Sequence, residues 1–155
     1  MAASWQRSLE LTQRLTILLA DDDPDDRLMA ADALEEARVA NPLACVEDGE
    51  ELLNYLSGTG KFAGEPPPRP GLILLDLNMP RVDGRQALAR IKQDPDLRKI
   101  PVIILTTSES HDDISQTYDL GVNSFITKPV SFVGLVDVMR SLRHYWLETV
   151  ALPAA

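Results

Sequence analysis

Residues 15–24 read LTILLADDDP, and this stretch decides the fold of the chain. The apolar run 15–20 has the length of a strand, and strands buried on both faces are apolar throughout. Pro24 is typical of the first turn of a helix. The apolar residues that follow it are spaced three apart, at Leu28, Ala31, Leu34 and Ala37. The stretch therefore predicts a strand, an acidic loop and a helix.

The same order of strand and helix recurs along the rest of the chain. We expect further strands at residues 43–46, 72–75, 102–105 and 124–127. The helices that follow them are expected at residues 50–57, 85–93, 112–120 and about 132–147. Consecutive parallel strands need a crossover connection, and its helices cover both faces of the sheet. The pattern therefore predicts a doubly wound α/β fold, (βα)5, with a five-stranded parallel sheet.

The length of the chain sets its domain organisation. A chain of 155 residues with 45% hydrophobic content can bury one core. We place the globular domain at 15–148, between an N-terminal arm at 1–14 and a flexible C-terminal tail at 149–155. Residues 58–71 carry four prolines, so they cannot form a regular helix or a central strand. They predict an extended loop.

Composition excludes several classes of function. The net charge of −9 argues against a protein that binds nucleic acid through clustered Lys and Arg. No window approaches the roughly 18 apolar residues that span a bilayer, and the N-terminus lacks a signal peptide's apolar stretch. Cys45 is the only cysteine, and its apolar neighbours predict a small buried side chain in a reducing compartment. We therefore expect a cytoplasmic protein without membrane or nucleic-acid partners.

Three adjacent carboxylates, Asp21, Asp22 and Asp23, follow the first expected strand. Adjacent carboxylates repel each other unless a cation shares the site, and Mg²⁺ prefers oxygen ligands of this kind. Asp23 beside Pro24 is the residue that we assign to capping the next helix. Asp21 and Asp22 remain as candidate metal ligands, because a cap needs one acid.

Asp76 ends the apolar run 72–75, so it is expected at the carboxyl edge of the sheet, where doubly wound folds bind ligands. A carboxylate there can act as a nucleophile toward phosphorus if cations neutralise the incoming charge. The loop that follows leaves the backbone carbonyl of Asn78 free to face a metal.

Two further strand ends carry polar residues. The hydroxyl of Thr106 can donate to a phosphoryl oxygen, although a Thr at a strand end is unremarkable by itself. Lys128 supplies the positive charge that the acids lack. Pro129 after it raises the chance of a cis peptide bond that would aim Lys128 into the cleft.

Taken together, these segments strongly resemble the receiver domain of bacterial two-component response regulators, a flavodoxin-like fold. The matching segments are ILLADDDP at 17–24, LLDLNMP at 74–80, DG at 83–84, LT at 105–106 and KP at 128–129. The resemblance covers roughly residues 15–147. It implies that a sensor histidine kinase is the partner and that its phosphohistidine is the phosphoryl donor. The long segment 58–71 resembles the single-domain subgroup that works with phytochrome-type kinases.

The resemblance also implies a role for each site residue. Asp76 would be the phosphoacceptor; Asp22, Asp76 and the Asn78 carbonyl would bind Mg²⁺ directly, and Asp21 would act largely through water. Thr106 and Lys128 would hold phosphoryl oxygens. Asn78 and Ser108 occupy the positions that tune dephosphorylation.

Signal output is expected at the surface formed by residues 112–120, 124–127 and 132–147. Phe125 stands at the family's switch position, where Tyr is common, and an ordinary core aromatic is the other interpretation. Tyr145 and Trp146 either pack in the core or contact a second copy in a homodimer.

An aspartyl-nucleophile phosphohydrolase is the alternative function. Enzymes of the haloacid-dehalogenase type place a second Asp two residues after the nucleophile, and this chain has Asn78 there. Because that general acid is missing, we favour a phosphoacceptor that is not an enzyme but promotes its own phosphorylation and autodephosphorylation.

Overall fold

The computed structural model describes residues 15–153, which form a five-stranded parallel sheet in the order β2-β1-β3-β4-β5. The strands are β1 (Thr16–Ala20), β2 (Leu43–Val46), β3 (Pro70–Leu75), β4 (Val102–Thr106) and β5 (Ser124–Thr127). The helices are α2 (Pro24–Glu36), α3 (Gly49–Ser57), α4 (Gly84–Gln93), α5 (His111–Asp119) and α6 (Phe132–Leu142). The predicted doubly wound α/β fold is confirmed.

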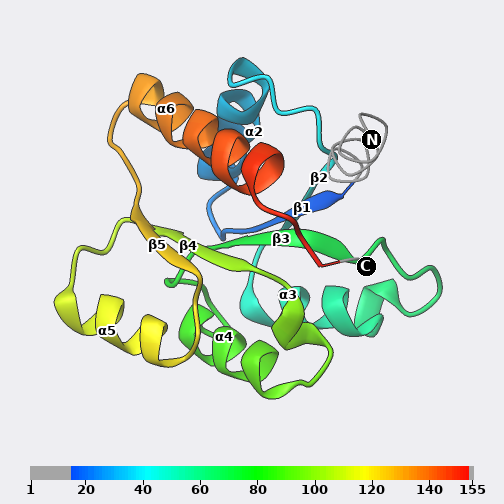
Figure 1. The fold of residues 1–155 in the computed structure, drawn as a ribbon. Coiled ribbons are helices and arrows are strands. Elements are labelled where there is room, and N and C mark those ends of the chain that lie inside the picture. Colours follow the sequence, from blue (N-terminus) through cyan, green and yellow to red (C-terminus); the bar gives the residue numbers. More distant parts are fainter. Residues whose placement is uncertain (1–14, 154–155) are drawn as a thin grey trace.

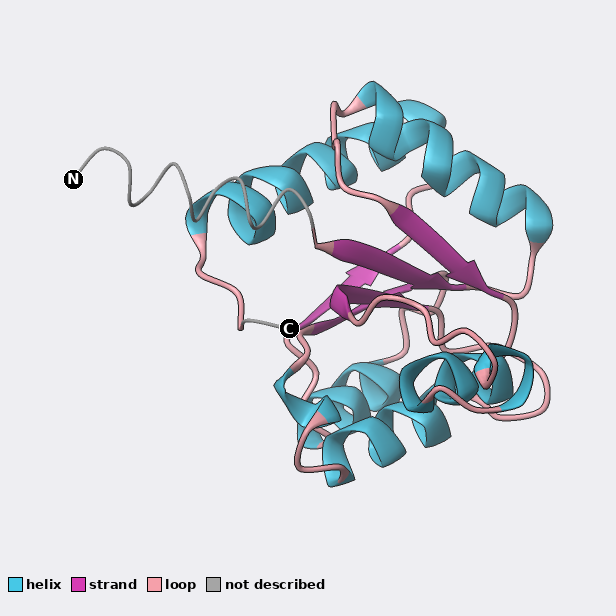
Figure 2. Cartoon of the chain, turned by 90° about the vertical axis from the view of Figure 1, so that its right-hand side faces the viewer, coloured by secondary structure: helices cyan, strands magenta, loops and turns pink. Residues whose placement is uncertain are grey.

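Helices cover both faces of the sheet, with α2 and α6 on one face and α3, α4 and α5 on the other (Figures 1 and 2). Side chains alternate along β1: Leu18 joins the core beneath α3 and α4, whereas Ile17 and Leu19 join the core beneath α2 and α6. All residues of β1, β3 and β4 are buried. This two-sided burial explains the uninterrupted apolar runs in the sequence.

The strand order reverses between β1 and β3, because β2 lies on the other side of β1. Ala20 pairs with Leu75 in the register of β1 and β3, so the next residues, Asp21 and Asp76, leave the sheet side by side. The Asp76 N–H donates to the Ala20 carbonyl at 3.0 Å. A ligand site is expected at such a switch point.

The loop between α3 and β3 contains a short 3-10 helix, Gly60–Phe62. The Tyr55 hydroxyl donates to the Pro68 carbonyl at 3.0 Å, and the Tyr55 and Phe62 rings meet edge to face. The loop prediction is wrong at its last two positions, because β3 begins at Pro70 and is a central strand. Proline is tolerated there as the first residue of the strand.

Three other findings concern Cys45 and the chain ends. Cys45 is exposed, so the expected burial is wrong: among the described strands, β2 lies at the edge of the sheet and pairs only with β1. The last helix continues beyond α6 as a π-helical segment, Arg143–Thr149, and Leu152 packs against the core. The proposed arm, 1–14, and the final residues 154–155 lie outside the described residues.

Among the described helices, none combines the length and apolar content needed to cross a bilayer.

Candidate functional site

Sheet register brings four of the candidate side chains together. Asp21 and Asp76 follow the paired ends of β1 and β3. Thr106 pairs with Thr127 at the ends of β4 and β5, so Lys128 is the first residue beyond β5. The Lys128 N–H donates to the Thr106 carbonyl at 2.7 Å, which continues the ladder by one step. The strands therefore deliver two acids, a hydroxyl and an ammonium group to one cleft.

Lys128 bridges the acids at the centre of this cleft. Its Nζ lies 2.5 Å from Asp21 Oδ2 and 3.2 Å from Asp76 Oδ2. A third carboxylate, Asp26 on α2, lies 3.4 Å from the same Nζ. The Lys128 ammonium is therefore surrounded by more negative charge than it can neutralise.

Burial and pairing act in opposite directions on the titration of these groups. Burial disfavours the Lys128 ammonium, but the hydrogen bond to Asp21 and the charge of Asp76 outweigh it and raise the Lys128 pKa. For Asp21, which is 2% exposed, burial dominates and raises the pKa of the carboxyl despite the hydrogen bond from Lys128. The site thus holds Asp21 at an electrostatic cost that a further cation would reduce.

The Asp76 carboxylate receives donors on both oxygens. The hydroxyl of Thr106, which is fully buried, donates to Asp76 Oδ1 at 2.9 Å. The Asn78 N–H reaches the same oxygen at 3.2 Å, and Lys128 approaches the other. Asp76 is 8% exposed, so its carboxylate is oriented by the protein more than by solvent.

Carboxylate oxygens of Asp21, Asp22 and Asp76 all lie within 4.8 Å of one another. Hard divalent cations bind oxygen ligands of this kind. Asp23 takes no part in this group: its carboxylate accepts the N–H of Asp25 at 2.8 Å and caps α2, as expected from the sequence. The chemistry and spacing of the acids fit one divalent metal ion.

The loop from Asp76 to α4 is anchored on the side of α3. Arg81 adopts a left-handed conformation, with φ of 66°, and its Nη1 pairs with the buried carboxylate of Asp48 at the start of α3. Gly84 begins α4 in direct contact with the backbone of Asp76, and a Cβ there would lie 2.3 Å from the Asp76 carbonyl oxygen. Close packing at Gly84 and the Arg81 ion pair therefore fix the path of the Asn78 loop.

The other loop beside Asp76 carries Ser108. The Ser108 hydroxyl donates to Asp113 at 2.6 Å, and Asp113 in turn pairs with Arg85 of α4 at 2.7 Å. Ser108 is thus tied to α5 and α4, and no hydrogen bond joins it to Asp76 among the described residues.

Phe125 and Pro129 differ in how far they meet expectation. Phe125 lies on β5, half-buried against the core beneath α3 and α4. This position suits an ordinary core aromatic, and the switch role stays a prediction. The expected cis bond before Pro129 is wrong, since no described peptide bond is cis. Strand pairing and the ion pairs with Asp21 and Asp76 direct Lys128 into the cleft instead.

A cavity of about 240 Å³ adjoins Lys128 between α2 and the loop after β5, and Met29 and Val130 line it. Met29 and Val130 of this lining are large, exposed apolar side chains, and further exposed apolar residues stand close to them in the sequence. We call this set the α2 rim patch: Leu28, Met29, Val130, Phe132 and Val133. Exposed apolar side chains that gather around a reactive group are typical of a protein interface.

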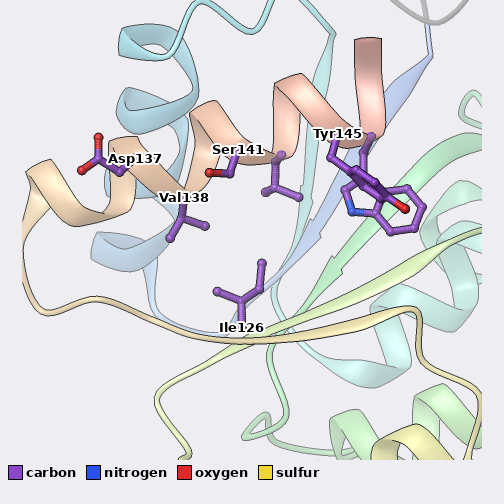
Figure 3. A pocket seen from close by; sticks show the side chains of 7 residues that line it. Ile126, Asp137, Val138, Ser141 and Tyr145 are labelled. Carbon is purple, nitrogen blue, oxygen red and sulfur yellow. The ribbon is translucent and has the colours of Figure 1, made fainter. Parts of the chain in front are cut away.

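A separate groove lies between β5 and α6 (Figure 3). Ile126 of β5 faces Val138 of α6, and the groove extends to the aromatic pair Tyr145 and Trp146. Trp146 packs partly into the core, while Tyr145 is 54% exposed. The structure therefore supports core packing for part of the Trp146 side chain, and it leaves Tyr145 exposed, so a partner contact through Tyr145 stays a prediction.

Sequence reasoning missed Asp26, Arg81 and Arg85. Asp26 stands one turn into α2, where its acid reads as a helix N-terminal residue. The two arginines flank the DG segment at 83–84, and a basic residue in such a loop carries no signal of its partner in single-sequence reading.

Comparisons with known proteins agree with the geometry. Residues 17–140 match the model of the response regulator receiver domain family. Response regulator Rcp1 of Synechocystis sp. is 42% identical over 139 residues, which cover 90% of this chain and 93% of Rcp1. The probable methanogenesis regulatory protein FilR2 of Methanothrix harundinacea is 37% identical and covers 90% of this chain and 88% of FilR2.

Solved structures extend the comparison to three dimensions. The Mn²⁺-bound form of Rcp1 has a TM-score of 0.82 at 41% identity, covering 90% of this chain and 99% of that one. The phosphorylated cyanobacterial phytochrome response regulator RcpA has a TM-score of 0.84 at 41% identity, covering 91% of this chain and 99% of that one. The resemblance read from the sequence is confirmed, and this chain belongs to the response regulator receiver domain family.

Proposed function

We propose that this response regulator accepts a phosphoryl group on Asp76 from the phosphohistidine of a sensor histidine kinase, in a Mg²⁺-dependent reaction. The observation that carries the proposal is the Asp76 carboxylate itself. It lies in the cleft beside two other acids, with Thr106 donating to one oxygen and Lys128 to the other. A carboxylate oriented in this way can attack phosphorus while nearby donors receive the phosphoryl oxygens.

In the transfer step, an Asp76 carboxylate oxygen bonds to phosphorus as the bond between phosphorus and the histidine nitrogen breaks. The electron pair of that bond stays on the imidazole, which takes up a proton. Lys128 and Thr106 stabilise negative charge on the transferring phosphoryl oxygens. Magnesium, held by Asp21, Asp22, Asp76 and the Asn78 carbonyl, would supply further neutralisation of that charge.

The kinase is proposed to dock on the α2 rim patch. Phosphotransfer requires a histidine to reach Asp76, so the kinase must cover the mouth of the cleft. Val130 is fully exposed and Met29 is 40% exposed, and both line the cavity that adjoins Lys128. Burying these side chains would favour complex formation. Because Rcp1 and RcpA are similar to this chain, and RcpA is a phytochrome response regulator, we propose a phytochrome-type kinase in the cytoplasm.

Output is proposed to pass through the surface of α5, β5 and α6, with Phe125 as the switch residue and a second copy of the chain as partner. Tyr145 supplies an exposed aromatic side chain at the end of the β5–α6 groove. Sedimentation of the wild type and of Tyr145→Ala, with and without phosphorylation, tests this dimer. The dimer proposal would be contradicted if Tyr145→Ala had the same monomer content as the wild type, both with and without phosphorylation.

Labelling with acetyl phosphate and Mg²⁺, followed by intact-mass measurement, tests the phosphoacceptor. We expect one phosphoryl adduct on the wild type and none on Asp76→Asn. The control variant Asp119→Asn, which changes an exposed acid at the end of α5, should also take one adduct. An adduct that persists in Asp76→Asn contradicts the assignment. Turnover of added phosphomonoesters would instead support a phosphohydrolase. Omitting Mg²⁺ or replacing it with Ca²⁺ tests the metal.

A panel of histidine kinases tests the partner. We expect faster phosphotransfer from phytochrome-type kinases than from other kinases, and slower transfer to Val130→Asp than to wild type. Labelling of Val130→Asp by acetyl phosphate should be normal, because the small donor needs no docking surface. Equal transfer to both proteins would contradict the docking proposal.

A further inference from the structure

Arg85 connects the two loops that flank Asp76. Its Nε and Nη2 donate to Asp113 Oδ1 at 3.0 and 2.7 Å, and its Nη1 donates to Asp83 Oδ2 at 3.2 Å. Asp83 closes the loop that leaves β3, and Asp113 lies in the first turn of α5, beyond the loop that leaves β4. The Arg85 side chain is only 24% exposed, so this is more than a solvated surface pair.

Asp113 passes the connection on to Ser108. One carboxylate oxygen of Asp113 accepts from Arg85 and the other accepts from the Ser108 hydroxyl. Ser108 is also held by its neighbours: its Oγ accepts the Ser110 N–H, and its carbonyl accepts the Thr127 hydroxyl at 3.3 Å. Hydrogen bonds from Ser108 and Arg85 lower the pKa of Asp113, which keeps the carboxylate ionised at neutral pH.

This network closes a ring around Asp76. On one side, Gly84 packs against the Asp76 backbone, directly before Arg85. On the other side, Thr106 donates to the Asp76 carboxylate, two residues before Ser108. The ring runs from Asp76 through Gly84, Arg85, Asp113, Ser108 and Thr106 back to Asp76. Its members come from β4, α4, α5 and the loops that follow β3 and β4. Breaking the link between Arg85 and Asp113 therefore removes the side-chain connection between the two loops.

We infer that Arg85 is a positioning residue that slows hydrolysis of the Asp76 acyl phosphate by fixing the gap between these two loops. This inference rests on the proposed function. In hydrolysis, a water oxygen bonds to phosphorus, and the bond from phosphorus to the Asp76 oxygen breaks. The electron pair returns to the carboxylate, inorganic phosphate leaves, and a water proton passes to solvent. The attacking water must approach opposite the Asp76 oxygen. The ring limits the room for that approach by holding Ser108 in place.

The lifetime of the phospho form tests the inference. Wild type, Arg85→Ala, Asp113→Ala and the double variant are labelled with acetyl phosphate and Mg²⁺, desalted, and followed by intact mass. Each single variant should lose the phosphoryl group about fivefold faster than wild type, and the double variant no faster than the faster single one, because both break one link. Arg85→Lys should restore part of the lifetime. Arg140→Ala, which removes an exposed ion pair on α6, should match wild type.

The thermal midpoint, Tm, of each variant is measured on the same samples. A purely structural role for Arg85 would lower Tm and leave the lifetime unchanged, and that result overturns the inference. Multiplying effects in the double variant would overturn it as well, since they would show independent sites. If wild type takes no adduct on Asp76, both proposals fail, whereas normal labelling with equal lifetimes removes this inference alone.

Discussion

Asp76, Thr106 and Lys128 stand at the ends of paired strands, whereas Asn78 and Ser108 stand on the loops that leave those strands. The first group is positioned by sheet register, and its members hydrogen-bond directly to one another. The loop residues depend on polar anchors, namely Arg81 with Asp48 on one loop and Arg85 with Asp113 on the other. Under the proposed function, we expect the strand ends to determine whether transfer occurs and the loops to adjust its rate and duration.

Removing Lys128 breaks the strand-borne group and should have the largest effect. Lys128→Ala leaves Asp21 and Asp76 without their shared cation. We expect the rate of labelling by acetyl phosphate to fall about 100-fold. In the absence of metal, the free energy of unfolding should fall by about 3 kcal/mol, because a buried carboxylate loses its partner. Urea denaturation and labelling kinetics measure the two effects.

Magnesium sharpens this first prediction. Saturating Mg²⁺ should recover part of the lost stability of Lys128→Ala, because a bound cation again compensates the acids. Lys61→Ala serves as the control, since it removes a lysine that pairs with a single carboxylate, Glu51 of α3, and the Lys61 side chain is 66% exposed. Equal losses in the two variants would show that Lys128 stabilises the protein no more than a surface lysine.

The same division explains what the sequence could predict. Asp21, Asp76 and Lys128 each follow a short apolar run, and a parallel sheet brings such positions to one edge. The position of a residue at a strand end can therefore be predicted from the sequence alone. Arg81 and Arg85 have no such pattern, because their partners, Asp48 and Asp113, lie 33 and 28 residues away in other loops and helices.

Burial of Cys45 and the cis bond before Pro129 were wrong for a related reason. Both predictions rest on the preferences of neighbouring residues in the sequence. Such preferences give no information on where a strand lies in the sheet. Cys45 lies in an apolar run, but β2 is at the edge. Lys128 is directed by its partners across the sheet, so no cis bond is needed to orient it. Tertiary context decided both cases.

Gly84 tests the junction between the two regions. In Gly84→Ala, the new Cβ would lie 2.3 Å from the Asp76 carbonyl oxygen and 2.7 Å from Leu77 Cα, so α4 must move away from β3. We expect the free energy of unfolding to fall by about 2 kcal/mol. Gly64→Ala is a matched control, because a Cβ at Gly64 meets nothing within 4 Å. Similar urea midpoints for the two variants would contradict the close packing at Gly84.

Arg81 tests the loop group on the side of α3. Arg81→Ala removes the partner of the Asp48 carboxylate and releases the loop that carries Asn78. Because the proposed metal ligand is the Asn78 carbonyl, the dissociation constant for Mg²⁺ should rise about tenfold, the lower end of the range for losing a residue that orients a metal ligand. The labelling rate at saturating Mg²⁺ should stay near that of wild type. Calorimetric titration measures the affinity, and an affinity equal to that of wild type would separate Arg81 from the metal site.

Asp113 provides the smallest and most specific test, through pH. Hydrogen bonds from Ser108 and Arg85 hold the pKa of Asp113 below its ordinary value. Such a group stabilises the fold above its unfolded pKa, about 3.9, and loses this contribution as the pH falls through the lower folded value. Asp113→Asn should therefore cost about 1 kcal/mol near neutral pH, and its difference from wild type should shrink as the pH falls below the unfolded pKa. Asp112→Asn shares the first turn of α5 but removes no hydrogen bond to Ser108 or Arg85, so it controls for the effect of the helix dipole. If both variants lose the same stability with the same pH dependence, the Ser108 and Arg85 contacts contribute nothing beyond that dipole, and the loop anchors could not restrain the cleft.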